Sequence, residues 1–215
     1  MRRLIKGDKP NVLSKNEDKW TTDYVTAKRA GTEKKYEKWR HPEIQQALSE
    51  ETGKRCAYCE QFVADVAYPH VEHIIPKGLQ PELAHRWHNL TWACPVCNTN
   101  KGEFYHPTDG LLNPYEDEIE EHLRFHGDFA SSRLGANRGE ITVTQLKLNR
   151  IDLVTARVRR LASIKEMLER WYVAVEPMRS VLATAIRIDA TDGEFTATVE
   201  AYLEREGFPL KQSTS

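Results

Sequence analysis

The sequence lacks the features of several protein classes. Among its 215 residues there is no apolar run of the roughly 18 residues that cross a membrane, so we expect no membrane span. The basic start, residues 1–6, is not followed by an apolar stretch and does not resemble a secretory signal, so we expect a cytoplasmic protein. There is also no internal repeat and no low-complexity segment. With 40% hydrophobic and 29% charged residues, the composition is that of a globular protein.

The chain also has almost no net charge. Its formal value of −1 predicts neither nucleic-acid binding nor its absence. One local excess of charge lies in residues 147–160, where basic side chains outnumber the single acidic one. This run is either a contact surface for a phosphate backbone or an ordinary solvated helix face. Its basic members are Lys147, Arg150, Arg157, Arg159 and Arg160.

Composition and periodicity divide the chain into three zones. Residues 1–52 are charged with helical spacing, residues 53–110 are rich in Cys, His, Pro and aromatic side chains, and residues 111–215 return to helix. We therefore predict a mainly α fold around a small central zone, with Asn149 as a helix cap. The helices are expected at residues 23–39, 43–49, 151–173, 175–188 and from Thr191 or Asp192 to about 206, before a frayed tail at 211–215.

All four cysteines lie in the central zone, as two pairs. Cys56 and Cys59 form one Cys-x-x-Cys turn, and Cys94 and Cys97 form the other. Such a turn points both thiolates at one ion, and two turns complete a tetrahedral shell for Zn²⁺. A four-thiolate shell has no open position, so this zinc would be structural. Free thiols or an iron–sulfur cluster are the alternatives.

A second constellation lies between and just after these pairs. Glu72 directly precedes His73, Asn89 lies shortly before the second pair, and Asn98 follows its last cysteine. This order and spacing resemble the HNH endonuclease motif over residues 53–106. The resemblance implies two antiparallel strands followed by a helix, with one divalent metal ion held between them.

The resemblance also implies a role for each position. His73 would be the general base that activates water, because a neutral imidazole suits that task near pH 7. Glu72 and Asn98 would bind the metal ion, and Asn89 would fix the His73 ring by a hydrogen bond. Lys101 is a candidate phosphate contact. Each residue also has a plainer reading, as an ordinary histidine, turn residue or helix cap.

Two positions depart from the family pattern. Glu72 stands where aspartate is commoner, and Asn98 stands where histidine is usual, which gives an HNN variant. Two oxygen ligands favour Mg²⁺ or Mn²⁺. His70 is the nearest rival to His73 for a base or metal role, whereas His85 and His88 are expected at the surface or near the substrate.

Segments beyond this motif are similar to a family of small bacterial HNH proteins. They are Gly110-Leu111-Leu112-Asn113-Pro114-Tyr115-Glu116-Asp117 and Gln145-Leu146-Lys147-Leu148-Asn149-Arg150. Some members of that family, the Septu-type effectors, act with an ATPase in anti-phage defence. The resemblance therefore implies a defence role and an ATPase partner.

The function that follows is metal-dependent hydrolysis of phosphodiester bonds, with DNA favoured over RNA as the substrate. Two alternatives stay open. One is an RNA-cleaving enzyme with the same site, because metal-assisted attack on a phosphate needs no particular base and no 2′-hydroxyl. The other is a non-catalytic zinc-binding adaptor for nucleic acid or protein, which would not need Glu72, His73 and Asn98.

Overall fold

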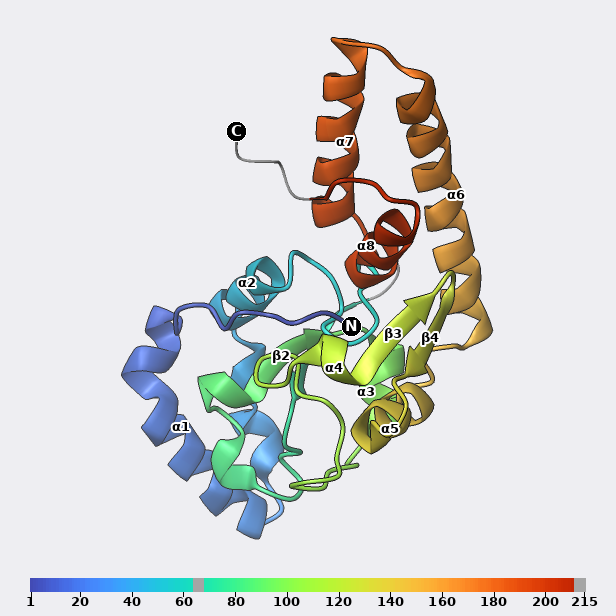
Figure 1. The fold of residues 1–215 in the computed structure, drawn as a ribbon. Coiled ribbons are helices and arrows are strands. Elements are labelled where there is room, and N and C mark those ends of the chain that lie inside the picture. The colour runs from blue at the N-terminus through green and yellow to red at the C-terminus, as the bar shows by residue number, and fades with distance from the viewer. Residues whose placement is uncertain (64–67, 211–215) are drawn as a thin grey trace.

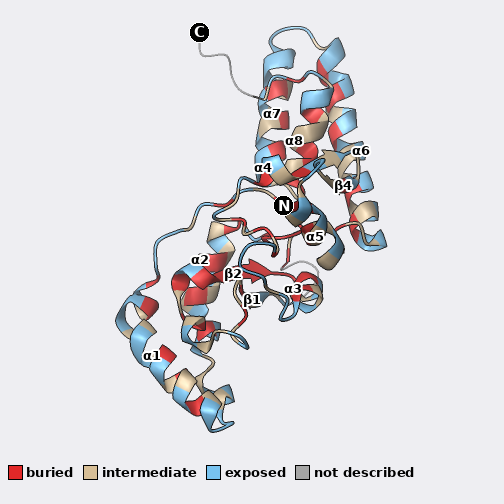
Figure 2. Ribbon diagram, turned by 60° about the horizontal axis from the view of Figure 1, so that its bottom comes forward, coloured by how far each residue is buried: buried red, intermediate tan, exposed pale blue. Residues whose placement is uncertain are grey.

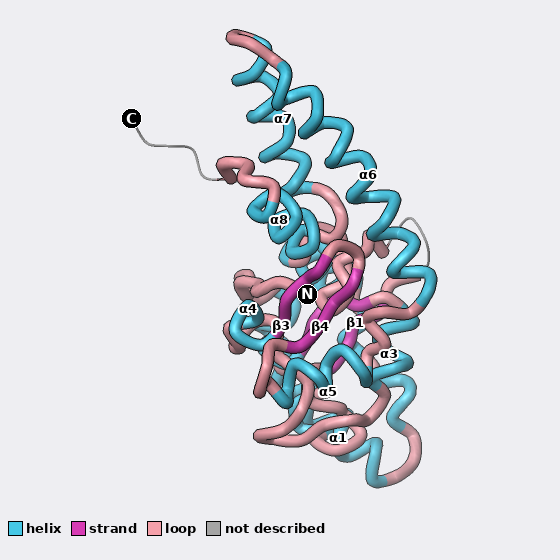
Figure 3. The backbone as a smooth tube through the Cα atoms, turned by 45° about the vertical axis from the view of Figure 1, so that its right-hand side comes forward, coloured by secondary structure: helices cyan, strands magenta, loops and turns pink. Residues whose placement is uncertain are grey.

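The computed structural model describes residues 1–63 and 68–210 of the chain. Short strands and many helices confirm the predicted mainly α class, since 53% of the described residues are helical (Figures 1 and 3). The expected frayed tail, residues 211–215, lies outside the described residues. The elements are α1 (Asn11–Arg29), α2 (Pro42–Glu51), β1 (His70–His73), β2 (Leu90–Ala93), α3 (Pro95–Lys101), α4 (Ile119–His122), β3 (Leu123–His126), β4 (Phe129–Ser132), α5 (Asn137–Gln145), α6 (Ile151–Val173), α7 (Met178–Asp192) and α8 (Thr196–Arg205).

The central zone contains the expected strand–strand–helix unit. Strands β1 and β2 pair antiparallel, with Glu72 opposite Thr91 and His73 opposite Leu90. Only Cys94 separates β2 from α3, so the helix begins directly at the end of the strand. Helix α3 contacts β1, so the face of β1 that carries Glu72 meets the helix that carries Asn98. A second hairpin, β3 and β4, forms a separate two-stranded sheet.

The described residues form two hydrophobic cores. The larger one joins side chains of α1 and α2, the cysteine turns and β2 to the segments that follow, and it includes Leu13, Ile44 and Leu153. The smaller one lies among α6, α7 and α8 and includes Ile164 and Leu203. Figure 1 shows α6 and α7 side by side, extending away from the strand–strand–helix unit, and Figure 2 shows the buried residues in both regions. The zone boundaries at residues 52 and 110 stay predictions.

The N-terminal helices differ from their predicted ranges. Helix α1 ends at Arg29 and not at residue 39, because Gly31 takes a left-handed φ of 68° that ends the helix. Residues Glu33–Tyr36 and Lys38–Arg40 form short 3₁₀ turns. The predicted helix at 43–49 is confirmed as α2, with Pro42 in its first turn.

The C-terminal helices match the prediction more closely. Helix α6 covers the predicted residues 151–173. The prediction that Asn149 caps it is wrong, because the Asn149 amide instead pairs with both backbone groups of Ala130, at 2.9 and 2.7 Å. Asp192 ends α7 and does not cap the next helix, which begins at Thr196. None of the helices in the described part of the chain is long and apolar enough to cross a membrane.

Candidate functional site

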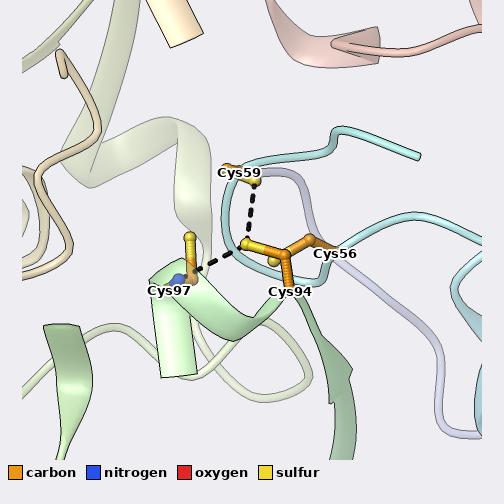
Figure 4. Close-up of side chains that lie close together, drawn as sticks. All are labelled: Cys56, Cys59, Cys94 and Cys97. Atoms are coloured by element: carbon orange, nitrogen blue, oxygen red, sulfur yellow. Dashed lines mark hydrogen bonds between the residues drawn. The ribbon is translucent and has the colours of Figure 1, made fainter. Parts of the chain in front are cut away.

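The four cysteines come together in one buried cluster. Their sulfur atoms all lie within 4.8 Å of one another, and Figure 4 shows them converging from the two turns. The sulfurs of Cys59 and Cys94 are 3.9 Å apart, and the Cys97 backbone amide donates to the Cys94 sulfur at 3.3 Å. This arrangement fits a tetrahedral metal ion bound by four thiolates, as the spacing predicted.

The electrostatics of the cluster also favour a cation. Hydrogen bonds from the other three cysteines lower the pKa of the Cys94 thiol, which favours a thiolate there, whereas burial raises the pKa of Cys56 and hydrogen bonds raise that of Cys97. The Arg150 guanidinium approaches the Cys97 sulfur at 3.7 Å. A zinc ion bound by four thiolates would carry a net negative charge, which this arginine would offset.

The basic run at 147–160 is not a continuous surface. Arg157 is 1% exposed, donates to the Leu148 carbonyl at 2.8 Å and lies near the rings of Phe125 and Phe195. Arg160 donates to the Asp189 carbonyl at 2.8 Å. The interpretation of the whole run as a phosphate-binding stripe is therefore wrong, because burial and internal hydrogen bonds occupy these arginines.

The second cysteine turn is also the first turn of α3. The Cys94 side chain caps the helix by accepting the Cys97 amide, and the Asn98 amide donates to the Cys94 carbonyl at 3.0 Å. Pro95 occupies the first turn, where its missing N–H costs no hydrogen bond. Asn98 follows Cys97 directly, so the cysteine cluster sets the position of this predicted ligand.

One face of β1 presents two side chains to α3. His70 and Glu72 are two residues apart, so they lie on the same face of the strand. The His70 Nδ1 lies 2.7 Å from the side-chain nitrogen Nδ2 of Asn98. The Glu72 Oε1 lies 2.7 Å from the Lys101 ammonium nitrogen. The structure thus places Glu72 and Asn98 across the same contact between β1 and α3.

Glu72 is a buried carboxyl group, only 5% exposed. Burial raises its pKa, and the charge of Lys101 opposes that shift. A buried carboxylate needs a cation nearby, and a divalent ion would serve the same need as the lysine. The donor set of Glu72 and Asn98 therefore fits a hard divalent ion such as Mg²⁺ or Mn²⁺.

His73 is held as a neutral, oriented ring. Its Nε2 lies 2.9 Å from the Ala84 carbonyl oxygen, which can only accept, so Nε2 carries the hydrogen. Nδ1 is then the nitrogen able to take a proton. Burial, followed by the charge of Lys77, lowers the pKa of His73 to about 3, so the ring is neutral near pH 7.

Asn89 does not touch the His73 ring. Its Oδ1 accepts from the Ile75 amide at 2.7 Å, and its Nδ2 donates to the carbonyls of Ile75 and Leu83 at 3.0 and 3.2 Å. The prediction that Asn89 bonds to the His73 ring is therefore wrong, because its partners are backbone groups. Because Leu83 precedes Ala84, Asn89 fixes the turn whose carbonyl holds His73.

Lys101 is only 3% exposed and is fully engaged. Its ammonium group contacts Glu72 and donates to the His73 carbonyl at 2.8 Å. Lys77, which the sequence reasoning left without a role, lines a cavity of about 230 Å³ together with Glu72, His73 and Asn98. Glu72, His73 and Asn98 thus share one opening, and the half-buried Lys77 lines its wall together with the buried Lys101.

The other histidines near the site differ in their burial. His70 and His88 are exposed, whereas His85 is fully buried. The expectation that His85 lies at the surface is wrong, because its ring packs against those of Trp39, Tyr24 and Trp20, with centroid distances of 5.1, 5.8 and 6.0 Å.

Comparison with known proteins agrees with this geometry. Residues 56–104 match the family model described as HNH endonuclease. A protein of Bacillus thuringiensis named Septu protein PtuB is 28% identical over an alignment of 182 positions, and the match covers 77% of this chain and 70% of that protein. A protein of the same name from Bacillus mycoides (strain KBAB4) is 26% identical over an alignment of 155 positions, and the match covers 58% of this chain and 52% of that protein. The resemblance predicted from the motifs is therefore confirmed.

Proposed function

We propose that this chain, whose residues 56–104 match the HNH endonuclease family, hydrolyses phosphodiester bonds of nucleic acid, with DNA favoured over RNA. One observation carries the proposal: Glu72, His73 and Asn98 line a single cavity beside the cysteine cluster. A metal-ligand pair and a neutral histidine in one opening are the parts that metal-assisted hydrolysis needs.

His73 is the proposed general base. The Ala84 carbonyl fixes its Nε2–H, so Nδ1 takes the proton of the attacking water. The low pKa of the free site keeps His73 unprotonated near pH 7, which a general base requires. Asn89 contributes by fixing the Leu83 carbonyl next to the Ala84 carbonyl.

Glu72 and Asn98 are the proposed ligands of a catalytic Mg²⁺ or Mn²⁺. When bound, the ion neutralises charge on the scissile phosphate and on the leaving oxygen. Lys101 keeps the Glu72 carboxyl group ionised and oriented, because it donates to that carboxylate and to the His73 carbonyl at the same time. The cysteine cluster holds structural Zn²⁺ and fixes the start of α3, which carries Asn98.

Lys77 is the proposed phosphate contact, in place of Lys101. It lies between the cavity of the motif residues and an adjoining one lined by His70 and Arg40. Two cations at the rim of these cavities suit a phosphate backbone and give binding that depends on salt but not on base sequence.

The biological setting comes from the curated relatives. Both are named Septu protein PtuB, and the family that the motifs resemble includes anti-phage effectors that act with an ATPase. We therefore place this chain as the nuclease component of such a defence system, with an ATPase as its partner.

The test is cleavage of plasmid DNA and of structured RNA in Mg²⁺ or Mn²⁺. The unaltered chain is compared with His73→Ala and with His126→Ala, which changes an exposed histidine of β3 outside the site. We expect cutting by the unaltered chain and by His126→Ala, and none by His73→Ala. The cut substrate separates the DNA enzyme from the RNA enzyme.

Equal cutting by His73→Ala would refute the assigned base. If no protein cuts, the assay is repeated in the presence of the proposed ATPase partner. Failure there as well would favour the non-catalytic adaptor.

A further inference from the structure

His70 lies in the central zone but belongs neither to the cysteine cluster nor to the proposed general base. It begins β1, and its ring is exposed. On the same strand face, Glu72 lies two residues further along. Both side chains meet α3, His70 through Asn98 and Glu72 through Lys101.

The contact between His70 and Asn98 has the spacing of two ligands of one ion. The His70 Nδ1 and the Asn98 amide nitrogen are 2.7 Å apart. The oxygen and nitrogen of an asparagine amide exchange places by a half turn about its last bond, which brings Oδ1 to the same point. Two atoms bound at about 2.1 Å to an octahedral ion lie roughly 3 Å apart, close to the observed contact.

The surroundings of His70 leave room for an ion. His70 and Asn98 line one cavity, and Glu72 and Asn98 line the next. Asn98 and Lys77 belong to both cavities, so the two openings adjoin at Asn98. An ion bound there by Asn98 would be within the reach of the Glu72 carboxylate and of the His70 imidazole.

We propose that His70 is a third protein ligand of the catalytic divalent ion, beside Glu72 and Asn98. The proposal rests on the proposed function, because it adds to the same metal site. It also has a chemical consequence. An imidazole nitrogen binds first-row transition ions better than Mg²⁺, so the site should prefer Mn²⁺ to Mg²⁺.

The test measures metal binding without nucleic acid. Zinc-loaded protein is titrated with Mn²⁺ and followed by electron paramagnetic resonance, and Mg²⁺ affinity is measured by competition. Pulsed measurements on the Mn²⁺ complex detect coupling to the nitrogen of a bound imidazole. The variants are His70→Ala, His70→Asp, which offers an oxygen ligand, and Glu72→Gln. His126→Ala is the matched control, an exposed strand histidine away from the site.

Loss of even an outer-shell partner lowers metal affinity about 10–100-fold, so His70→Ala should weaken Mn²⁺ binding at least about tenfold. Mg²⁺ binding should fall less, and the nitrogen coupling should vanish. His70→Asp should restore Mg²⁺ binding without the coupling. His126→Ala should match the unaltered chain.

Two results would overturn the proposal, and they are distinguishable. If Glu72→Gln abolishes Mn²⁺ binding but the unaltered chain shows no imidazole coupling, His70 is not a ligand, while the proposed function stands. In that case an equal loss of Mn²⁺ and Mg²⁺ affinity in His70→Ala would show that His70 only positions Asn98. If the unaltered chain binds no Mn²⁺, or Glu72→Gln binds it normally, the metal site of the proposed function fails as well.

Discussion

The indole of Trp39 stands edge-on to the imidazole of His73, with the ring centroids 4.8 Å apart and the planes at 88°. Trp39 is 2% exposed and reaches the site from the 3₁₀ turn before α2, outside the HNH match. Together with the Ala84 carbonyl, it restricts the proposed base to one orientation. The N-terminal zone therefore forms part of the wall around His73.

This contact predicts the effect of changing Trp39. Trp39→Ala removes a buried indole and should destabilise the fold by about 3–5 kcal/mol. It should also lower kcat, because the His73 ring gains freedom. Trp39→Phe keeps an aromatic edge and should retain most of the activity. Thermal unfolding and cleavage rates at saturating substrate measure both effects, and an unchanged kcat in a folded Trp39→Ala protein would contradict the positioning role.

Asn89 and Asn149 form a natural pair for comparison. Each uses its side-chain amide to bond backbone groups of another segment. Either change to alanine removes hydrogen bonds from partly buried backbone groups, and each such group costs at most about 1–3 kcal/mol. Only Asn89→Ala should also abolish most cleavage, because it frees the Leu83–Ala84 turn. Urea unfolding and cleavage assays separate the two losses; equal activity in both variants would exclude a positioning role for Asn89.

Lys77 and Lys101 should differ in how they affect nucleic-acid binding. Lys77→Met removes a cavity-wall cation and should weaken binding, with the slope of log K against log salt falling by about one. Lys101→Met should leave that slope unchanged but destabilise the fold by about 3–5 kcal/mol, because Glu72 loses its buried partner. Salt titrations of DNA binding, together with urea unfolding, provide the measurement. A reduced slope in Lys101→Met would restore the role first predicted for this lysine.

The buried His85 predicts a loss of stability in acid. Burial lowers its pKa to about 4, whereas an unfolded histidine titrates near 6.5. Between these values the unfolded chain binds more protons, so the free energy of unfolding falls as the pH falls from about 6.5 toward 4. Protonation linked to His85 alone should lower the free energy of unfolding by about 2–3 kcal/mol at pH 4.5. Urea unfolding at pH 7 and pH 4.5 should show a smaller difference for His85→Phe, and an identical difference would refute the assignment.

Zinc removal should abolish both folding of the central zone and cleavage. Structural zinc contributes on the order of 10 kcal/mol in small zinc domains, and here the proposed ion would be bound by the cysteines of the first turn of α3. A thiol-competing chelator followed by excess Mg²⁺ should give inactive protein with reduced helical circular dichroism, and Zn²⁺ should restore it. Metal analysis should find one zinc per chain; iron with visible absorbance would indicate the cluster alternative.

Local patterns in the sequence predicted the parts of the site that are local in space. The two cysteine turns and the Glu72-His73 and Cys97-Asn98 neighbours are short segments whose spacing fixes their chemistry. The range of α6 was predicted because its apolar periodicity continues over 23 residues. The prediction at 23–39 was wrong because Gly31 ends a helix that begins earlier, at Asn11.

Contacts between segments that are distant in the chain could not be predicted from local sequence patterns. The spacing of charges around Arg157 does not indicate that two phenylalanines, one of them 38 residues later, enclose its guanidinium. Nor could the pattern indicate that Lys101 turns inward to Glu72 and not outward to a phosphate. The partner of Asn89 was missed for the same reason, since it depends on which turn the fold brings beside β1.

The shared turn of α3 has a consequence for the response to oxidants. Cys97 and Asn98 are consecutive residues of α3. Oxidation of the Cys97 thiol would therefore change the position of Asn98, the proposed ligand of the catalytic ion. Peroxide that converted the cysteines to disulfides or sulfenic acids would release the zinc and unwind the segment that presents Asn98. Nuclease activity would then persist only while these thiols stay reduced, although no cysteine takes part in phosphodiester hydrolysis.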